Sequence, residues 1–188
     1  MSCCTGQAVE QVQRVNIVGP PKLTCKIAIL GNSNSGKTTL IHRLVHDTMP
    51  DIDKPTCGVG YNDYMVQRNT GSIPCQIWDT AGQEKYGALV PVYIRDTDLC
   101  LIALPCNESV KVNLASLAHW TKMIETVSSG CRIVVVGTKC DLVADNKQPG
   151  CECSGQDYLL TSSLMGVGID ELRELLAREI AESLRTDR

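Results

Sequence analysis

Phenylalanine is missing from all 188 residues, and tryptophan and tyrosine supply the 4% of the chain that is aromatic. No phenylalanine ring is therefore present to stack on a ligand. Charge of one sign is also scarce, because 18 Lys and Arg residues face 21 Asp and Glu residues, for a net charge of −3. A balance so close to zero argues against a surface that coats nucleic acid, so no nucleic-acid partner is expected.

Long apolar runs are missing as well. None approaches the ~20 residues that a membrane span needs. The N-terminus also lacks the basic start and apolar core of a secretory signal. A cytoplasmic protein is therefore expected, and 188 residues are enough for one domain with a proper hydrophobic core.

A glycine-rich stretch follows the first apolar run of the chain. Gly31 to Thr38 read G-N-S-N-S-G-K-T and fit the phosphate-binding pattern G-x-x-x-x-G-K-[ST]. Its glycines let backbone N–H groups turn toward phosphate oxygens. Lys37 can reach the β- and γ-phosphates, and the Thr38 hydroxyl can ligate Mg²⁺. Residues 23–30 predict a strand before this loop and residues 38–45 a helix after it, which is the context that the motif requires.

Eleven cysteines are a high count for such a chain. With a nucleotide-binding loop present, a reducing cytosol is a better interpretation than a disulfide framework. Several cysteines lie in apolar runs and are expected to act as small hydrophobic residues, namely Cys25, Cys75, Cys100 and Cys131. Cys151 and Cys153 lack a second ligand pair at zinc spacing, so an exposed thiol pair in a loop is favoured over a metal site.

Apolar periodicity predicts alternating strands and helices along the chain. Strands are expected over residues 61–67, 73–78, 99–104 and 132–136, with a hairpin turn over 68–72, and residues 159–163 are expected to form the last strand and its exit turn. A helix is expected over 110–127, with its apolar side formed by Leu114, Leu117, Trp120, Ile124 and Val127. Another is expected over 169–184, with core-facing residues Leu172, Leu175, Leu176 and Ile180. This order predicts an α/β fold: an open, mostly parallel sheet with helices on both faces and the ligand at the carboxyl ends of the strands.

Polar residues that could bind a metal ion, phosphate or a base follow two of these strands. Asp79 comes directly after an apolar strand, where it suits a water-mediated contact with Mg²⁺. Gly82 can offer its N–H to a γ-phosphate, and Gln83 can orient a water for in-line attack. Farther along, Asp141 can accept both N–H donors on one edge of guanine, a pair that adenine does not present. The Lys139 stem can lie flat over the base.

With these motifs in one order, the chain resembles the Ras superfamily of small GTPases over residues 22–184. The matching segments are 31–38, 55–56, 79–84, 138–141 and 161–163. Within the superfamily it looks most like Rab, because residues 56–59 and 83–86 resemble the two Rab switch regions. Thr138, which replaces the usual asparagine, and Pro91 are Rho-like features. The resemblance implies the three-layer P-loop NTPase fold, with a six-stranded, mostly parallel sheet that contains one antiparallel strand.

The resemblance also implies a role for each matching residue. Lys37, Thr56 and Gln83 would carry the hydrolysis. Thr38 and Thr56 would ligate Mg²⁺ directly, and Asp79 would do so through water. The other implied nucleotide contacts are Asn34, Ser35, Gly36 and Thr39 at the phosphates, Gly82 at the γ-phosphate, and Met49, Thr138, Lys139, Asp141, Ser162, Ser163 and Leu164 around guanine.

The implied function is a GTP/GDP switch in vesicle traffic, in which hydrolysis releases the loops around Thr56 and Gln83. No arginine occupies an obvious position to act in cis, so hydrolysis is expected to be slow until a GTPase-activating protein adds ~10³–10⁵ in rate. An exchange factor and an effector are the other expected partners of a monomeric protein. Tyr61, Trp78 and Tyr93 match the aromatic trio that Rab proteins present to effectors, with ordinary core packing as the competing interpretation.

Several positions depart from the family pattern. Met49 occupies the place of a phenylalanine against guanine, Asp53 replaces a switch aromatic residue, and Leu164 stands where a lysine often flanks the base. We therefore expect weaker guanine affinity and faster exchange than the family norm. The short stretch between Asp141 and Thr161 predicts that the family's fourth helix is reduced to a turn or lost.

The two ends of the chain are expected to lie outside the GTPase domain. Residues 1–21 are predicted to form a flexible arm and residues 185–188 a short tail. Cys3 and Cys4 could accept palmitate, although unmodified thiols are favoured. Because the last cysteine is Cys153, no prenyl anchor is expected. Any membrane association would be peripheral, at an endomembrane.

Two other functions remain open from the sequence. One is a GTPase-like scaffold that holds nucleotide weakly or constitutively and hydrolyses little of it. The intact set Lys37, Thr38, Thr56, Asp79 and Gln83 argues against that. The other is a P-loop kinase or ATPase, against which the guanine-selective segment 138–141 argues.

Overall fold

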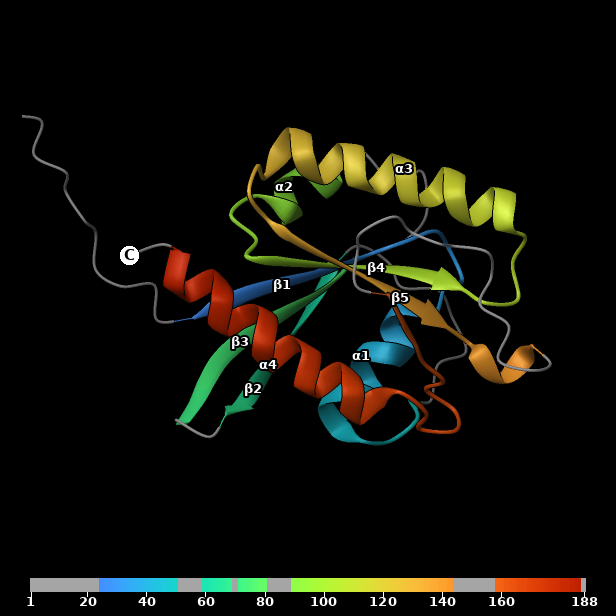
Figure 1. Ribbon diagram of the computed structural model, residues 1–188, viewed down its shortest axis with the longest axis horizontal. Helices are drawn as coiled ribbons and strands as arrows, with labels where there is room; N and C mark the ends of the chain where they lie inside the picture. The colour runs from blue at the N-terminus through green and yellow to red at the C-terminus, as the bar shows by residue number, and fades with distance from the viewer. Residues whose placement is uncertain (1–23, 51–58, 69–70, 81–88, 144–157, 187–188) are drawn as a thin grey trace, which may run out of the picture.

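A six-stranded sheet forms the centre of the computed structural model, which describes residues 24–50, 59–68, 71–80, 89–143 and 158–186 (Figure 1). The strand order across the sheet is β2-β3-β1-β4-β5-β6. In chain order the elements are β1 (Cys25–Leu30), α1 (Lys37–His46), β2 (Val59–Arg68), β3 (Gly71–Thr80), α2 (Val90–Ile94), β4 (Leu99–Pro105), α3 (Val110–Val127), β5 (Arg132–Thr138), the 3-10 helix η2 (Cys140–Leu142), β6 (Tyr158–Leu160) and α4 (Ile169–Thr186).

The strand pairing confirms the predicted fold class. β2 and β3 run antiparallel, with Tyr61 opposite Trp78, and every other described pair is parallel. In the middle of the sheet, Leu101 of β4 pairs with Val134 of β5. Both strands are buried along most of their length, which explains their nearly continuous apolar sequences.

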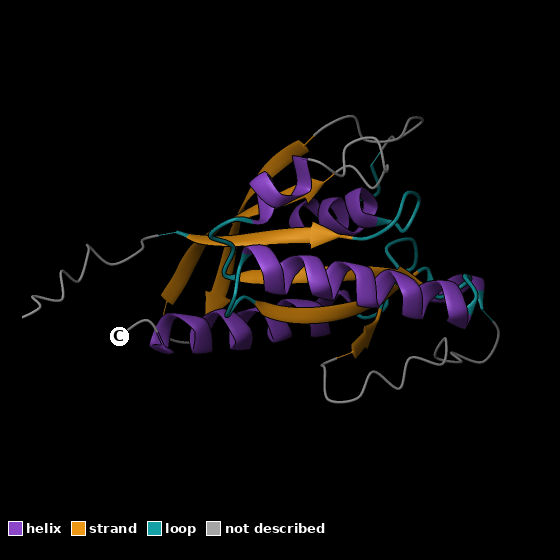
Figure 2. Cartoon of the chain, turned by 90° about the horizontal axis from the view of Figure 1, so that it is seen from above, coloured by secondary structure: helices purple, strands orange, loops and turns teal. Residues whose placement is uncertain are grey.

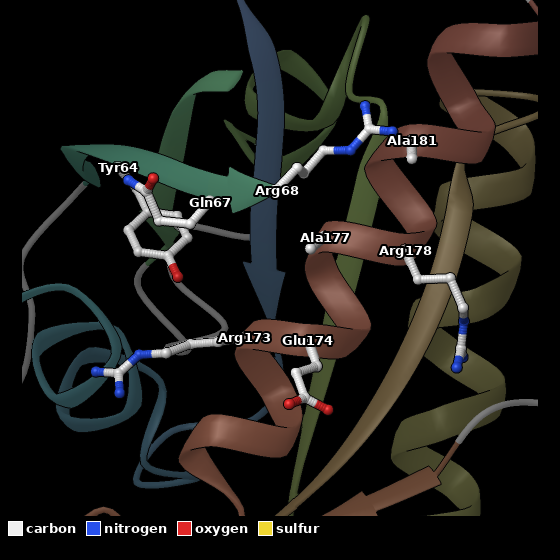
Figure 3. Close-up of a pocket in the computed structure, with 8 residues that line it drawn as sticks. All are labelled: Tyr64, Gln67, Arg68, Arg173, Glu174, Ala177, Arg178 and Ala181. Atoms are coloured by element: carbon white, nitrogen blue, oxygen red, sulfur yellow. The ribbon is translucent and has the colours of Figure 1, made fainter. Parts of the chain in front are cut away.

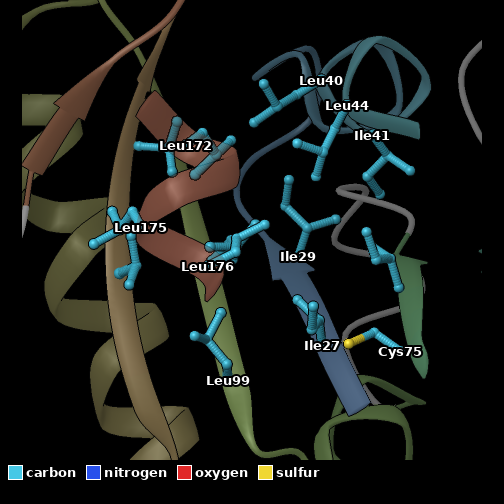
Figure 4. Close-up of a cluster of buried hydrophobic side chains, with 14 of the residues drawn as sticks. Ile27, Ile29, Leu40, Ile41, Leu44, Cys75, Leu99, Leu172, Leu175 and Leu176 are labelled. Atoms are coloured by element: carbon cyan, nitrogen blue, oxygen red, sulfur yellow. The ribbon is translucent and has the colours of Figure 1, made fainter. Parts of the chain in front are cut away.

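Helices α1 and α4 cover one face of the sheet. Alternate residues of β1, among them Ile27 and Ile29, point to this face because successive side chains of a strand point to opposite sides. Figure 4 shows these side chains meeting Leu40 and Leu44 of α1 and Leu176 of α4. The inward positions predicted for the helix over 169–184 are confirmed, since Leu172, Leu175, Leu176 and Ile180 are all buried.

Helices α2 and α3 cover the opposite face. Ala28 and Leu30, the other set of β1 residues, pack there with Ile94 of α2 and with Trp120 and Ile124 of α3. The three layers are visible in Figure 1, where α2 and α3 lie across the sheet from α1 and α4, and in Figure 2, where helices flank the strands. Cys25, Cys75 and Cys100 are buried free thiols in this core, as expected of small hydrophobic residues.

Three details differ from the sequence-based expectation. Helix α2 was not predicted, because its sequence V-P-V-Y-I is short and β-branched; Pro91 is tolerated in its first turn. Strand β6 begins at Tyr158, one residue before the predicted start at residue 159, and it ends at Leu160, ahead of the expected exit turn. On α3, Leu114 was predicted to face the core but is 46% exposed, and the polar Asn113 and Ser116 are buried instead.

Several expectations concern residues that lie outside the described ranges. These are the arm over residues 1–21 and most of the stretch 143–157, where the fourth helix was expected to be reduced. Helix α4 reaches Thr186, within the stretch that was expected to be a tail. Among the described residues, no helix is both long and apolar enough to cross a bilayer.

Candidate nucleotide-binding site

The glycine-rich loop connects β1 to α1, as its sequence predicts. Gly31 must be glycine, because a Cβ there would come within 2.6 Å of the Ala103 carbonyl oxygen on β4. Gly36 has φ +84° and begins α1, where the left-handed conformation favours glycine. Backbone N–H groups at the start of a helix attract anions, so this loop is suited to hold phosphate.

Lys37 lies at the centre of the loop and is only 5% exposed. Its Nζ donates hydrogen bonds to the carbonyl oxygens of Gly31, at 3.0 Å, and Asn32, at 2.7 Å. Burial lowers the pKa of Lys37 to about 8, against an opposing effect of the nearby Asp79 carboxylate. An ammonium held in this way favours an anion beside it, because the anion would compensate its lost hydration.

Asp79 lies near the end of β3 and is also buried. Burial raises the pKa of its carboxyl group, and a hydrogen bond with the Thr38 side chain partly opposes that effect. Among the described residues, its Oδ1 atom has no hydrogen-bond partner. A hydroxyl and an unsatisfied carboxylate oxygen are the hard oxygen donors that Mg²⁺ prefers, so these side chains fit the expected metal ion.

The last residue of β5 and the residue after it are hydrogen-bonded to the phosphate loop. The Thr138 hydroxyl donates to the Ser35 carbonyl oxygen at 2.6 Å. Lys139 Nζ donates to the Asn34 carbonyl oxygen at 2.7 Å and to Asn34 Oδ1 at 3.2 Å. Residues more than one hundred positions apart are thus held together at the carboxyl ends of β1 and β5.

Asp141 is oriented by a residue from the turn after β6. The Ser162 hydroxyl donates to Asp141 Oδ1 at 2.5 Å and accepts the Met165 backbone N–H at 3.1 Å. The second carboxylate oxygen of Asp141 is not used in this bond. The carboxylate is therefore held in one orientation, as an acceptor for paired donors on a base should be.

A pocket of about 160 Å³ collects the residues predicted around guanine. Met49 and Leu164 lie at its edge and are 43% and 60% exposed. The full set lining the pocket is Gly36, Thr39, Met49, Thr138, Lys139, Asp141, Ser163 and Leu164. The structure thus brings the predicted base-binding segments together, whereas Asp53, Thr56, Gly82 and Gln83 lie outside the described residues.

The aromatic trio forms a row on the outside of the sheet. The Tyr61 and Trp78 rings are 6.0 Å apart, and the Trp78 and Tyr93 rings are 6.4 Å apart and stacked. Lys26 Nζ lies over the Trp78 ring at 4.8 Å. Because Tyr61 is 61% exposed, ordinary core packing does not account for it.

A second groove, of about 600 Å³, lies away from the nucleotide site between β2 and α4 (Figure 3). Its lining consists of Tyr64, Gln67, Arg68, Arg173, Glu174, Ala177, Arg178 and Ala181. Arg173 is paired with Asp170 at 2.6 Å and Arg178 with Glu179 at 3.3 Å. With Glu174 in the same lining, the groove presents little excess positive charge to an anion.

Comparison with known proteins decides the family. Residues 26–141 match the family described as Roc, the Ras of Complex domain of DAPkinase. The chain belongs to this Roc/Ras-like family of GTPase domains, within the Ras superfamily. It is therefore a guanine-nucleotide-binding switch that hydrolyses GTP.

This GTPase domain is similar along most of its length to Rab proteins. It is 28% identical to Ras-related protein Rab-3C of Bos taurus over 173 residues, which cover 86% of this chain and 75% of that protein. Identity to human Ras-related protein Rab-3B is 27%, over 86% of this chain and 78% of that one. The GTP-binding protein YPT53 of Saccharomyces cerevisiae is 28% identical, over 85% and 78% of the two chains. The GTPase is thus Rab-like, as its motifs indicate.

Proposed function

We propose that this GTPase is a Mg²⁺-dependent, Rab-like switch in vesicle traffic, with residues 22–184 as its GTPase domain. The observation that carries the proposal is the buried pair of Lys37 and Asp79 at the phosphate loop, with the half-buried Thr38 hydrogen-bonded to Asp79. Burying an ammonium and a carboxylate is costly, and a chain without phosphate and metal ligands would gain nothing from it. The similarity to Rab proteins supports the same conclusion.

Each part of the site has a proposed task. Residues Asn34 to Thr39 hold the phosphates, with Lys37 supplying the charge. Thr38, Thr56 and Asp79 would hold Mg²⁺, and the ion would supply positive charge to neutralise the phosphates. Thr56 and Gly82 sense the γ-phosphate, and Gln83 orients the attacking water.

The base-binding end selects guanine. Asp141, held by Ser162, accepts the paired donors on the guanine edge, while the Lys139 stem lies along the base. Thr138 braces the phosphate loop, and Ser163, Met49 and Leu164 complete the pocket. A thioether and an aliphatic side chain provide no aromatic face, which supports weaker binding and faster exchange than the family norm.

Partners act at the switch side of the molecule. We propose that an effector contacts the row of Tyr61, Trp78 and Tyr93, and that an exchange factor and a GTPase-activating protein act on the loops around Thr56 and Gln83. Hydrolysis by the chain alone is slow, because a partner must supply the arginine that stabilises the transition state. The protein is proposed to be a cytoplasmic monomer with, at most, peripheral contact with an endomembrane.

The deciding experiment measures binding and turnover together. Fluorescent mant-GDP and mant-GTP are bound with Mg²⁺ or with EDTA, and single-turnover hydrolysis is followed for the wild type and Gln83→Leu. The proposal requires Mg²⁺-dependent, guanine-selective binding and slow hydrolysis that Gln83→Leu abolishes. Turnover that is indifferent to Gln83, or binding that is indifferent to Mg²⁺, would contradict it.

A further inference from the structure

The buried face of α3 is polar where it approaches the phosphate loop. Asn113 is 1% exposed and Ser116 is 6% exposed, although apolar residues were available on the neighbouring helical positions. A polar side chain is costly to bury unless it finds a hydrogen-bond partner. The partners of these side chains therefore indicate what this face of the helix does.

Both partners lie at the carboxyl ends of central strands. Asn113 Nδ2 donates to the Pro105 carbonyl oxygen, at the end of β4, at 3.0 Å. Ser116 Oγ and Trp120 Nε1 both donate to Asn32 Oδ1 in the phosphate loop, at 3.1 and 3.4 Å. Since an indole N–H can only donate, the amide oxygen of Asn32 must be the atom that faces α3.

The main chain of Asn32 is in turn hydrogen-bonded to the ammonium group of Lys37. Its carbonyl oxygen accepts from Lys37 Nζ at 2.7 Å and from the Ser35 backbone N–H at 3.2 Å. One residue therefore joins two donors on α3 to the ammonium group. If the Asn32 side chain lost both donors, its peptide group would be less restrained, and Lys37 would lose a fixed acceptor.

We propose that Ser116 and Trp120 are positioning residues of the phosphate site. They hold Asn32, and Asn32 holds the ammonium of Lys37 in line with the β-phosphate. Neither of them touches the nucleotide, and the inference rests on the phosphate-binding role proposed for Lys37. It predicts that α3 sets how tightly diphosphates and triphosphates are retained, without affecting recognition of the base.

The test removes the two donors, and the Trp120→Phe change also gives up part of the ring that packs in the core. Ser116→Ala deletes one hydroxyl, and Trp120→Phe keeps a ring but deletes the indole N–H. In the double variant we expect mant-GDP to be released about tenfold faster, since each lost hydrogen bond has a modest effect. Affinity for GMP, which has no β-phosphate for Lys37 to hold, is expected to be unchanged.

A matched control lies on the same helix. The Thr121 hydroxyl is buried next to Trp120 and has no partner among the described residues, so Thr121→Val removes a hydroxyl without breaking a bond. Its GDP release is expected to stay at the wild-type rate. The inference is overturned if the folded double variant releases GDP at the wild-type rate, or if GMP affinity falls as much as GDP affinity.

Two further measurements keep the outcomes distinct. If the double variant does not fold, the single variants carry the test, and GDP release at the wild-type rate in both overturns the inference. Lys37→Met tests the underlying assumption. If Lys37→Met leaves GDP affinity unchanged, the proposed phosphate site fails; if it weakens GDP but the α3 donors have no effect, only the role of α3 fails.

Discussion

The hydroxyl of Thr138 donates its one proton to the carbonyl oxygen of Ser35, 2.6 Å away, and both residues are buried. A threonine at this position thus holds the glycine-rich loop with the only hydrogen that its side chain can donate. The bond connects the end of β5, which precedes the residues proposed to bind the base, to the loop proposed to bind phosphate.

Thr138→Val should therefore destabilise the protein although it keeps the shape of the side chain. The Ser35 carbonyl would remain buried without this donor, a loss of about 1–3 kcal/mol in the free energy of unfolding. Urea denaturation of the nucleotide-free protein measures the effect. Thr138→Ser keeps the hydroxyl and serves as the control, and equal stability of the two variants would show that the bond contributes nothing.

The pKa of Lys37 predicts how stability depends on pH. In the folded protein this pKa is lowered from 10.5 to about 8, so the unfolded chain binds more protons between those values. Stability of the nucleotide-free protein should thus rise as the pH increases from 8 toward 10.5, and below pH 8 the buried ammonium should cost about 3 kcal/mol.

Lys37→Met provides the comparison, because it removes this titration, while the nearby Asp79 carboxyl group also loses the charge that lowers its pKa. The difference in unfolding free energy between wild type and variant, measured from pH 7 to 9.5, should shrink steadily above pH 8. A difference that is constant over this range would mean that Lys37 keeps its ordinary pKa. GDP should weaken the dependence in the wild type, because a phosphate stabilises the ammonium.

Asp79→Asn should act in opposite directions on stability and on metal binding. Burial raises the pKa of this carboxyl group, so stability falls as the pH rises from its ordinary range through the raised value. At neutral pH, removing the charge should stabilise the nucleotide-free protein in EDTA. The same change should lower Mg²⁺ affinity about 10–100-fold, as losses of outer ligands do.

Thermal unfolding in EDTA and GDP release at increasing Mg²⁺ concentrations measure the two effects of Asp79→Asn. A variant that is less stable in EDTA would show that the carboxylate is stabilised by protein contacts alone. Retention of the wild-type Mg²⁺ dependence would remove Asp79 from the metal site.

Met49→Phe should slow nucleotide release. Met49 lies at the edge of the guanine pocket, and an aromatic ring there could stack on the base. Stacking contributes ~1–3 kcal/mol per base, which corresponds to roughly 5–150-fold slower release of mant-GDP. Met49→Leu, which adds no ring, should release nucleotide at close to the wild-type rate. If Phe and Leu behave alike, the missing aromatic residue does not explain fast exchange.

Much of the fold could be predicted because its signals are local. The glycine loop, the strand before it and the helix after it are contiguous, and each is encoded by neighbouring residues. Likewise, α4 has a clear apolar period, and its four predicted inward residues are buried. The short helix α2 carried no such signal, because three of its five residues are β-branched and the others are proline and tyrosine, a composition that looks more like a strand than a helix.

Which side of α3 faces the sheet could not be predicted from the residues of the helix alone. Adjacent helical residues differ by about 100° around the axis, so Asn113 and Leu114 cannot both face the sheet squarely. Counting apolar residues favoured Leu114, but the helix turns Asn113 and Ser116 inward, where Pro105 and Asn32 offer partners. Hydrogen-bond partners that are distant in sequence outweighed the apolar pattern.

By itself the sequence determined the order of most strands and helices and located the segments proposed to bind phosphate and guanine, because these depend on residues within a few positions of one another. Only the tertiary structure decided which of these segments meet. Thr138 reaches Ser35, Ser162 reaches Asp141, and Trp120 reaches Asn32 across 103, 21 and 88 positions. Such bonds depend on strand order and on helix rotation against the sheet, which the packing of the whole core sets.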